Sequence, residues 1–142
     1  MSQRFTSSAE AEAAFYRAFE RADLDAMMEV WAEEDEVECV HPGGRRLTGL
    51  EEVRESWRRL FAGGSTLSFS VTQRQVWRGA LLAVHLVYEN IVSSRQERGT
   101  MIATNVYLLT ATGWRMVLHH AAPAPQIAEP AADDDTPPVR LH

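Results

Sequence analysis

The sequence predicts an α+β fold in which three N-terminal helices pack on one face of a curved antiparallel sheet. Apolar residues recur at helical spacing as far as about residue 62, and from residue 66 the apolar spacing drops to two, which is typical of strands. Residues 101–120 form two runs rich in Thr, Val, Tyr and Leu that are joined at Ala111-Thr112-Gly113, which predicts a β-hairpin. Helices grouped before strands are typical of α+β domains.

Each predicted helix begins at a recognisable signal. Ser7-Ser8-Ala9-Glu10 has the spacing of a capping box, and the apolar stripe behind it carries the first helix to about Arg21. Asp23 can cap a second helix whose apolar face includes Trp31. Thr48-Gly49-Leu50-Glu51 has the spacing of another capping box, so a third helix follows it, and Gly63-Gly64 ends that helix.

The strands are predicted from alternation and from apolar runs. Residues 37–40 indicate a short strand, and residues 66–77, 80–92 and the hairpin complete a four-stranded antiparallel meander. In the hairpin, alternation places Asn105 and Tyr107 on one face. Neither face is purely polar, so we expect helices to cover one face and a second subunit to cover the other.

The chain length suits one domain. With 142 residues it can bury a sizeable core without disulfides or a metal. We expect a flexible N-terminus over residues 1–6, a single domain over 7–122 and a mobile tail over 123–142. The tail is rich in Pro, Ala and Asp, so it buries too little surface to offset the entropy lost on ordering.

Composition excludes several classes of function. A net charge of −6 without a basic stripe disfavours binding to nucleic acid or to an anionic membrane. No stretch approaches the roughly 20 apolar residues of a membrane span, the N-terminus lacks the apolar core of a signal peptide, and Cys39 is the single cysteine, so we expect a cytoplasmic protein. All 14 basic residues are Arg, which excludes Schiff-base and Walker-type lysine chemistry.

Four segments carry a family resemblance. They are Trp31, the turn Val40-His41-Pro42-Gly43, the segment 48–57 (Thr-Gly-Leu-Glu-Glu-Val-Arg-Glu-Ser-Trp) and the segment 113–120 (Gly-Trp-Arg-Met-Val-Leu-His-His). With them the sequence resembles the nuclear transport factor 2-like superfamily, specifically its SnoaL-like branch. The ending from residue 113 onward is similar to the association domain of calcium/calmodulin-dependent protein kinase II and to bacterial relatives of that domain. The resemblance covers residues 8–125.

The resemblance implies a cone-shaped barrel with an internal cavity between helices and sheet, and a homodimer across the outer sheet face. In the kinase domain such dimers assemble into rings, and arginines line the cavity. Counted back from Trp114, one of those arginine positions falls on Asn105; another, near the end, falls on Ala121, and a third falls near Leu86. The sequence therefore keeps the scaffold and lacks that cationic pocket.

Three histidines and one carboxylate are the candidates for proton transfer. Among side chains only histidine titrates unperturbed near neutral pH, and His41, His119 and His120 lie near the predicted pocket walls. Alternation lets only one of His119 and His120 face the cavity, and the register of the family favours His120. Glu89 lies in an apolar strand, where an ionised carboxylate is costly unless paired; it is a candidate base, and an interface salt bridge explains it equally well.

The other candidate residues bind a ligand rather than react with it. Asn105 and Tyr107 can donate hydrogen bonds to a ligand oxygen, and core packing explains Tyr107 equally well. The remaining candidates are His41, Trp31, Trp57 and Phe61, of which the three aromatic residues form an apolar wall or simply fill the core. The scattered histidines fall short of metal-ligand spacing, so we expect neither a metal nor another cofactor.

Two functions remain open at this point. The first is a homodimeric association or small-molecule-binding module with a largely apolar cavity for a small apolar or ring-bearing ligand. The second is a small isomerase, cyclase or dehydratase acting on a hydroxy- or keto-bearing ring compound. In that enzyme His120 or Glu89 acts as the base, and Asn105 or Tyr107 polarises an oxygen. We rank the binding module ahead, because this fold hosts many chemistries and only the residues of the site, not the fold, can argue for a particular reaction.

Overall fold

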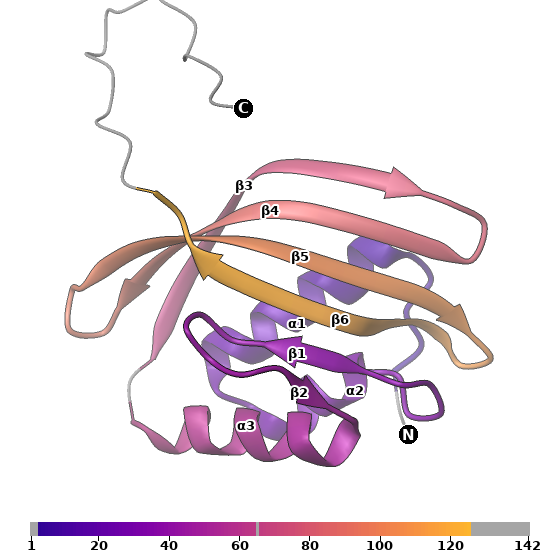
Figure 1. Ribbon diagram of the computed structural model, residues 1–142, viewed down its shortest axis with the longest axis horizontal. Coiled ribbons are helices and arrows are strands. Elements are labelled where there is room, and N and C mark those ends of the chain that lie inside the picture. Colours follow the sequence, from indigo (N-terminus) through magenta and orange to yellow (C-terminus); the bar gives the residue numbers. More distant parts are fainter. Residues whose placement is uncertain (1–2, 65, 126–142) are drawn as a thin grey trace, which may run out of the picture.

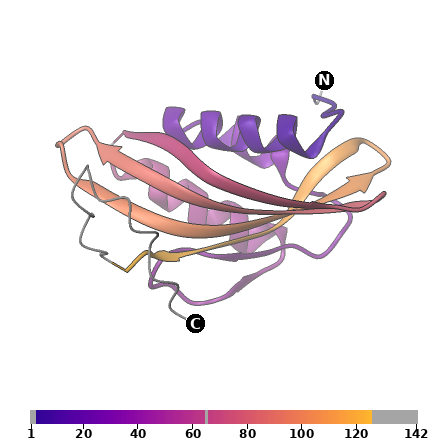
Figure 2. The ribbon, with the colours of Figure 1, turned by 90° about the horizontal axis from the view of Figure 1, so that it is seen from above.

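The computed structural model describes residues 3–64 and 66–125, and it has the α+β architecture that the sequence predicts (Figure 1). In chain order the elements are α1 (Ser8–Arg21), α2 (Leu24–Val30), β1 (Glu38–Val40), β2 (Leu47–Thr48), α3 (Leu50–Ala62), β3 (Leu67–Arg78), β4 (Leu82–Ser93), β5 (Arg98–Thr110) and β6 (Gly113–Pro123). Figure 2 shows α1 running across one face of the curved sheet, whose opposite face has no helix on it.

The sheet joins the first strands of the chain to the last. Its strand order is β2-β1-β6-β5-β4-β3, so β3 to β6 form the predicted antiparallel meander. β1 pairs in parallel with β6, and Glu38 lies opposite Leu118. The short strand β2, which the sequence did not predict, pairs with β1 at the sheet edge. The sheet therefore has six strands and is not closed into a full barrel.

The helix caps follow the predictions in part. The Ser7 side chain accepts the Glu10 N–H at 3.0 Å, as the capping box predicts, but the Glu10 carboxylate accepts the Thr6 N–H instead of the Ser7 N–H. The second predicted capping box is wrong, because Thr48 belongs to β2. Gly49, with φ 92°, precedes α3 without a side-chain cap.

Two bulges interrupt the alternation of side chains. In β3 the register shifts between Thr72 and Gln75, and Gln73 adopts φ 50°, so Arg74 turns toward α1. In β6 Leu118 lies opposite Val106 and Met116 lies opposite Tyr107, so one extra residue separates them. Each bulge reverses the faces that strict alternation predicts for the residues beyond it.

The second bulge corrects the assignment of the C-terminal histidines. His119 is buried on the helix-facing side of the sheet, and His120 is exposed. The extra residue at Val117 shifts the alternation by one position, so His119 shares the buried side with Met116. The expectation that His120 faces the interior is therefore wrong.

The core lies between the helices and the concave face of the sheet. Aromatic rings fill its centre, and Trp57 packs against Phe15 at 5.6 Å and Phe19 at 4.8 Å between ring centroids. Phe5, within the segment expected to be flexible, is also buried, and its carbonyl accepts the Trp114 N–H. Much of the predicted tail, residues 126–142, lies outside the described residues. None of the described helices has the length and apolarity needed to span a membrane.

Candidate functional site

A pocket of about 410 Å³ lies between α1 and the strands β3 and β4, and we call it the α1/β3 pocket. Its lining residues are Ala9, Glu12, Ala13, Tyr16, Val71, Arg74, Arg78 and His85. Glu12, Tyr16 and His85 are buried polar side chains at its inner wall. The chemistry of the pocket therefore depends on how these three side chains are held.

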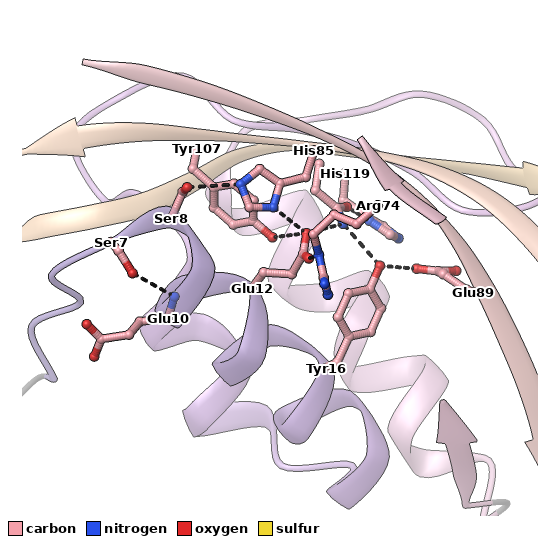
Figure 3. A network of polar contacts seen from close by, with 11 residues as sticks. Ser7, Ser8, Glu10, Glu12, Tyr16, Arg74, His85, Glu89, Tyr107 and His119 are labelled. Carbon is pink, nitrogen blue, oxygen red and sulfur yellow. Dashed lines mark hydrogen bonds and ion pairs between the residues drawn. The ribbon is translucent and has the colours of Figure 1, made fainter. Parts of the chain in front are cut away.

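Helical and strand periodicity bring the buried polar side chains together. Ser8, Glu12 and Tyr16 recur every four residues on α1, which places them on the same helix face. Alternation in β4 and β5 turns His85, Glu89, Asn105 and Tyr107 toward that face. Figure 3 shows the labelled side chains of this group converging. Together with Asn105, which bonds to Tyr16 and His119, and with Arg74, they form what we call the buried polar network.

Glu12 is the centre of the buried polar network. Its Oε1 accepts the Arg74 Nε–H at 2.6 Å, and its Oε2 lies 2.9 Å from His85 Nδ1. The Tyr107 hydroxyl at 3.3 Å and Asn105 Nδ2 at 3.4 Å also donate to Oε2. Burial raises the pKa of Glu12, but the hydrogen bonds and charges of His85 and Arg74 outweigh it, so the pKa lies below its ordinary value. Glu12 is therefore ionised at neutral pH.

Glu89 is the second buried carboxylate and behaves in the opposite way. The Tyr16 hydroxyl donates to its Oε2 at 2.6 Å and accepts Asn105 Nδ2 at 3.0 Å. Burial raises the pKa of Glu89 to about 7, although the Tyr16 hydrogen bond lowers it, and the charge of Glu12 raises it further. Burial and the Glu89 charge also raise the pKa of Tyr16. Two carboxylates with separated pKa values are the usual pattern of an acid–base pair.

His85 is held at both ring nitrogens. Nδ1 lies 2.9 Å from Glu12 Oε2, and Nε2 lies 2.9 Å from Ser8 Oγ. An ionised carboxylate can only accept, so Nδ1 carries the proton that bonds to Glu12. In the neutral ring, the lone pair of Nε2 then accepts the Ser8 hydroxyl.

The two other histidines near the core are poor bases. His119 Nδ1 lies 2.6 Å from Asn105 Oδ1, and burial lowers the pKa of His119 to about 3. His41 Nε2 lies 3.1 Å from Ser56 Oγ, and burial lowers its pKa as well. Both rings pack against Trp57. They are therefore neutral at physiological pH and extend the aromatic core.

The structure brings together only part of the site that the sequence predicts. Glu89, Asn105 and Tyr107 meet in the buried polar network. His120 is exposed and lies opposite Thr104, on the other side of the sheet. Trp31 and Trp57 are fully buried core residues, and Phe61 packs against that core. These three aromatic residues and His41 do not line the α1/β3 pocket, so their role in ligand binding stays a prediction.

Sequence reasoning missed Ser8, Glu12, Tyr16, Arg74 and His85. His85 carried a usable signal, because it stands in the same apolar strand as Glu89 and on the same face, four residues away. Glu12 carried a weaker signal, since it interrupts the apolar side of α1 four residues before Tyr16. Arg74 carried none, because only the bulge turns it inward.

Among the residues that the structure describes, no group of three or more His, Cys, Asp or Glu could hold a metal ion. Within the α1/β3 pocket, Glu12 is instead paired with Arg74 and His85, and Tyr16 is paired with Glu89 behind the wall. What the pocket offers a ligand is a set of hydrogen-bonding groups held in fixed positions.

Comparison with known proteins places this geometry in a family. Residues 9–125 match the model of the SnoaL-like domain. A candidate calcium/calmodulin-dependent protein kinase type II association domain from Thiobacillus denitrificans is 38% identical, with 86% of this chain and 98% of that chain covered and a TM-score of 0.77. A candidate dehydratase of the NTF2-like family from Streptomyces avermitilis is 32% identical, with 82% and 93% covered and a TM-score of 0.77.

A more distant relative is the F-box protein SKIP8 of Arabidopsis thaliana, which is 26% identical over 110 residues. The match covers 76% of this chain and 46% of the plant protein, so the chain spans less than half the length of that relative. The family model covers most of the chain, and both bacterial structures share its fold over nearly their whole length. The chain belongs to the SnoaL-like family of the NTF2-like fold.

Proposed function

We propose that the protein is a homodimeric small-molecule-binding domain whose ligand occupies the α1/β3 pocket. The observation that carries the proposal is a pocket of about 410 Å³ at whose wall Glu12, Tyr16 and His85 converge. Small-molecule sites typically have volumes of roughly 300–1,000 Å³ and a few placed polar groups. Val71, Ala9 and Ala13 supply apolar wall, so a small ring compound bearing a hydroxyl or keto oxygen fits this chemistry.

Proton transfer to such a ligand is the second candidate function, as in an isomerase, cyclase or dehydratase. The specific observation in its favour is Glu89, whose pKa of about 7 suits a group that gives and takes protons near neutral pH. Tyr16 joins Glu89 to the pocket, because its hydroxyl bonds to Glu89 while the residue lines the pocket. The relative from Streptomyces avermitilis that is described as a candidate dehydratase supports this chemistry by analogy.

The binding proposal is tested by ligand-detected NMR with cyclohexanol and cyclohexanone on the wild-type protein and on Ala13→Trp. Ala13 is an exposed residue of α1 that lines the pocket, so the new indole fills the pocket without entering the core. We expect Ala13→Trp to weaken binding at least tenfold.

The matched control is Ala62→Trp, at the exposed end of α3 and away from the pocket lining. It adds the same side chain and should leave binding unchanged. Binding that survives Ala13→Trp, or wild-type protein that binds neither compound at millimolar concentration, would contradict the proposal.

A further inference from the structure

We propose that Ser8 is a nucleophile activated by His85 and Glu12, and that the protein hydrolyses small esters at this serine. The reaction class goes beyond ligand binding, although the substrate enters through the same α1/β3 pocket. The proposal starts from the chain Ser8–His85–Glu12, in which a hydroxyl, an imidazole and a carboxylate follow one another in hydrogen-bonding contact (Figure 3).

The distances fit a nucleophile, its base and the group that orients the base. Ser8 Oγ lies 2.9 Å from His85 Nε2, and His85 Nδ1 lies 2.9 Å from Glu12 Oε2. Such a triad is recognised by geometry and roles, independently of the fold or the order of residues in the chain. Here the serine and the carboxylate come from one helix, and the histidine comes from β4.

The hydrogen bonds of His85 make the Oγ of Ser8 the reacting atom. The ionised Glu12 accepts the hydrogen bond of Nδ1–H, so the lone pair of Nε2 points at the Ser8 hydroxyl. Both ring nitrogens are occupied, and His85 can take up a proton only by way of Ser8. Proton transfer from Ser8 to this base therefore follows a hydrogen bond that is already formed.

Ser8 is not needed for the helix end at which it lies. Ser7 caps α1 by accepting the Glu10 N–H, so the Ser8 side chain is left to bond to His85. The N–H groups of Ser8 and Ala9 belong to the same first turn, where helix N–H groups lack intrahelical acceptors, and they are the donors nearest to an oxyanion that develops next to Ser8. Ser8 is 5% exposed and is not itself a lining residue of the pocket, but its chain neighbour Ala9 and its partner His85 are, which places Ser8 directly behind the pocket wall.

The other partners of Glu12 hold the triad in place. Arg74 binds Oε1 at 2.6 Å, and Tyr107 donates to Oε2 at 3.3 Å. A carboxylate held on both oxygens keeps one orientation and stabilises the imidazolium that forms when His85 accepts a proton. Arg74 is 45% exposed while Glu12 is 2% exposed, so the cation lies at the mouth and the anion lies inside.

The reaction has two balanced halves. Ser8 Oγ bonds to the acyl carbon of the ester, its proton passes to His85 Nε2, and the bond from the acyl carbon to the alkoxy oxygen breaks. The alcohol leaves with the proton from His85, and acyl-serine remains. Water then gives a proton to His85 Nε2 and its oxygen to the acyl carbon, and the bond between Oγ and the acyl carbon breaks. The carboxylic acid leaves, and His85 returns the proton to Ser8.

The test is covalent labelling of the wild-type protein with diisopropyl fluorophosphate, read by intact mass and peptide mapping. Attack by Ser8 forms the bond from Oγ to phosphorus and breaks the bond from phosphorus to fluorine, and the serine proton leaves with fluoride. We expect one adduct per chain, on Ser8, with hydrolysis of p-nitrophenyl acetate lost in the same proportion. We expect His85→Gln to slow labelling at least a hundredfold.

Ser7→Ala is the matched control, because it removes the neighbouring hydroxyl and leaves Ser8, His85 and Glu12 intact. It should label at the wild-type rate. The proposal is overturned if the wild-type protein stays unlabelled under conditions that fully label chymotrypsin. It is also overturned if Ser56 is labelled as strongly as Ser8, or if the adduct is lost in Ser7→Ala but not in Ser8→Ala. Cyclohexanol or cyclohexanone binding without labelling overturns this proposal alone, and failure of both measurements overturns the proposed function as well.

Discussion

Glu12 and Glu89 lie in one network, yet their effects on stability fall in different pH ranges. The lowered pKa of Glu12 means that its contribution is present above its unfolded value of 4.5 and is lost as pH falls through the still lower folded value. The raised pKa of Glu89, about 7, means the reverse: its contribution is fully present below 4.5 and is lost as pH rises through about 7. Of these two carboxylates, only Glu89 changes the free energy of unfolding appreciably between pH 5 and 8.

This difference gives a prediction for Glu89→Gln. A shift from 4.5 to about 7 corresponds to about 3 kcal/mol, at roughly 1.4 kcal/mol per pKa unit. We expect wild-type stability to fall relative to Glu89→Gln by about 2–3 kcal/mol between pH 5 and pH 8, as measured by urea unfolding. Glu97→Gln, on the exposed β4–β5 loop, is the control and should follow the wild type. A constant difference between wild type and Glu89→Gln would mean that Glu89 is ionised throughout.

Single residues show how far the sequence predicts the site. Glu89 could be identified because a carboxylate in an apolar strand needs a partner, and alternation correctly placed Asn105 and Tyr107 on one face of their strand. The partner itself, Tyr16, comes from a helix far away in the sequence, and no local pattern pairs a helix face with a particular strand. For the same reason the link from Ser8 to His85 appears only in three dimensions.

At the scale of elements, the bulges account for the orientations that alternation got wrong. The existence and order of the helices and of the meander were predictable, because hydrophobic periodicity and capping residues are local signals. A bulge adds one residue to a strand without changing its composition, so neither Arg74 nor His119 could be placed from alternation alone. The parallel pairing of β1 with β6 was also missed, since strand partners far apart in sequence leave no local signal.

The bulge in β3 can be tested at Gln73, which adopts φ 50°. Left-handed backbone is costly for residues with a branched Cβ, so Gln73→Val should lower the free energy of unfolding by about 1–2 kcal/mol. Gln73→Gly should be neutral or stabilising. Thermal and urea unfolding measure both changes.

Gln75→Val is the matched control for the bulge. Gln75 is also an exposed glutamine of β3, but it pairs regularly with Leu86, and β-branched residues suit extended strands. We expect its stability to be unchanged or slightly raised. Equal losses at both positions would show that the left-handed backbone of Gln73 does not set the cost.

At the scale of the whole molecule, the outer face of the sheet is the surface to explain. Figure 2 shows that no helix covers it, and Leu86, Ile102 and Val106 lie on this side and are only partly buried. Trp77 is 53% exposed and pairs with Val84 of the neighbouring strand. Contiguous apolar surface of this kind usually marks a site of association.

We therefore expect a dimer at micromolar concentration in sedimentation velocity, formed through this face. Ile102→Arg puts a charge at the centre of the sheet and should weaken the dimer at least tenfold. Ala111→Arg, in the exposed turn between β5 and β6, adds the same charge outside the face and should leave the dimer intact. A wild-type protein that sediments as a monomer would refute the expectation.

The pairing of β1 with β6 also determines when the protein can fold during its synthesis. Trp31 forms a bridge with Met116, and β1 is hydrogen-bonded along β6, so the helical half of the core needs the last of the described strands. Until that strand emerges, the part of α1 that packs on it stays uncovered, and exposed apolar surface of this kind makes a nascent chain prone to aggregate. A ribosome stalled before residue 113 should therefore carry a chain that remains sensitive to protease along its whole exposed length.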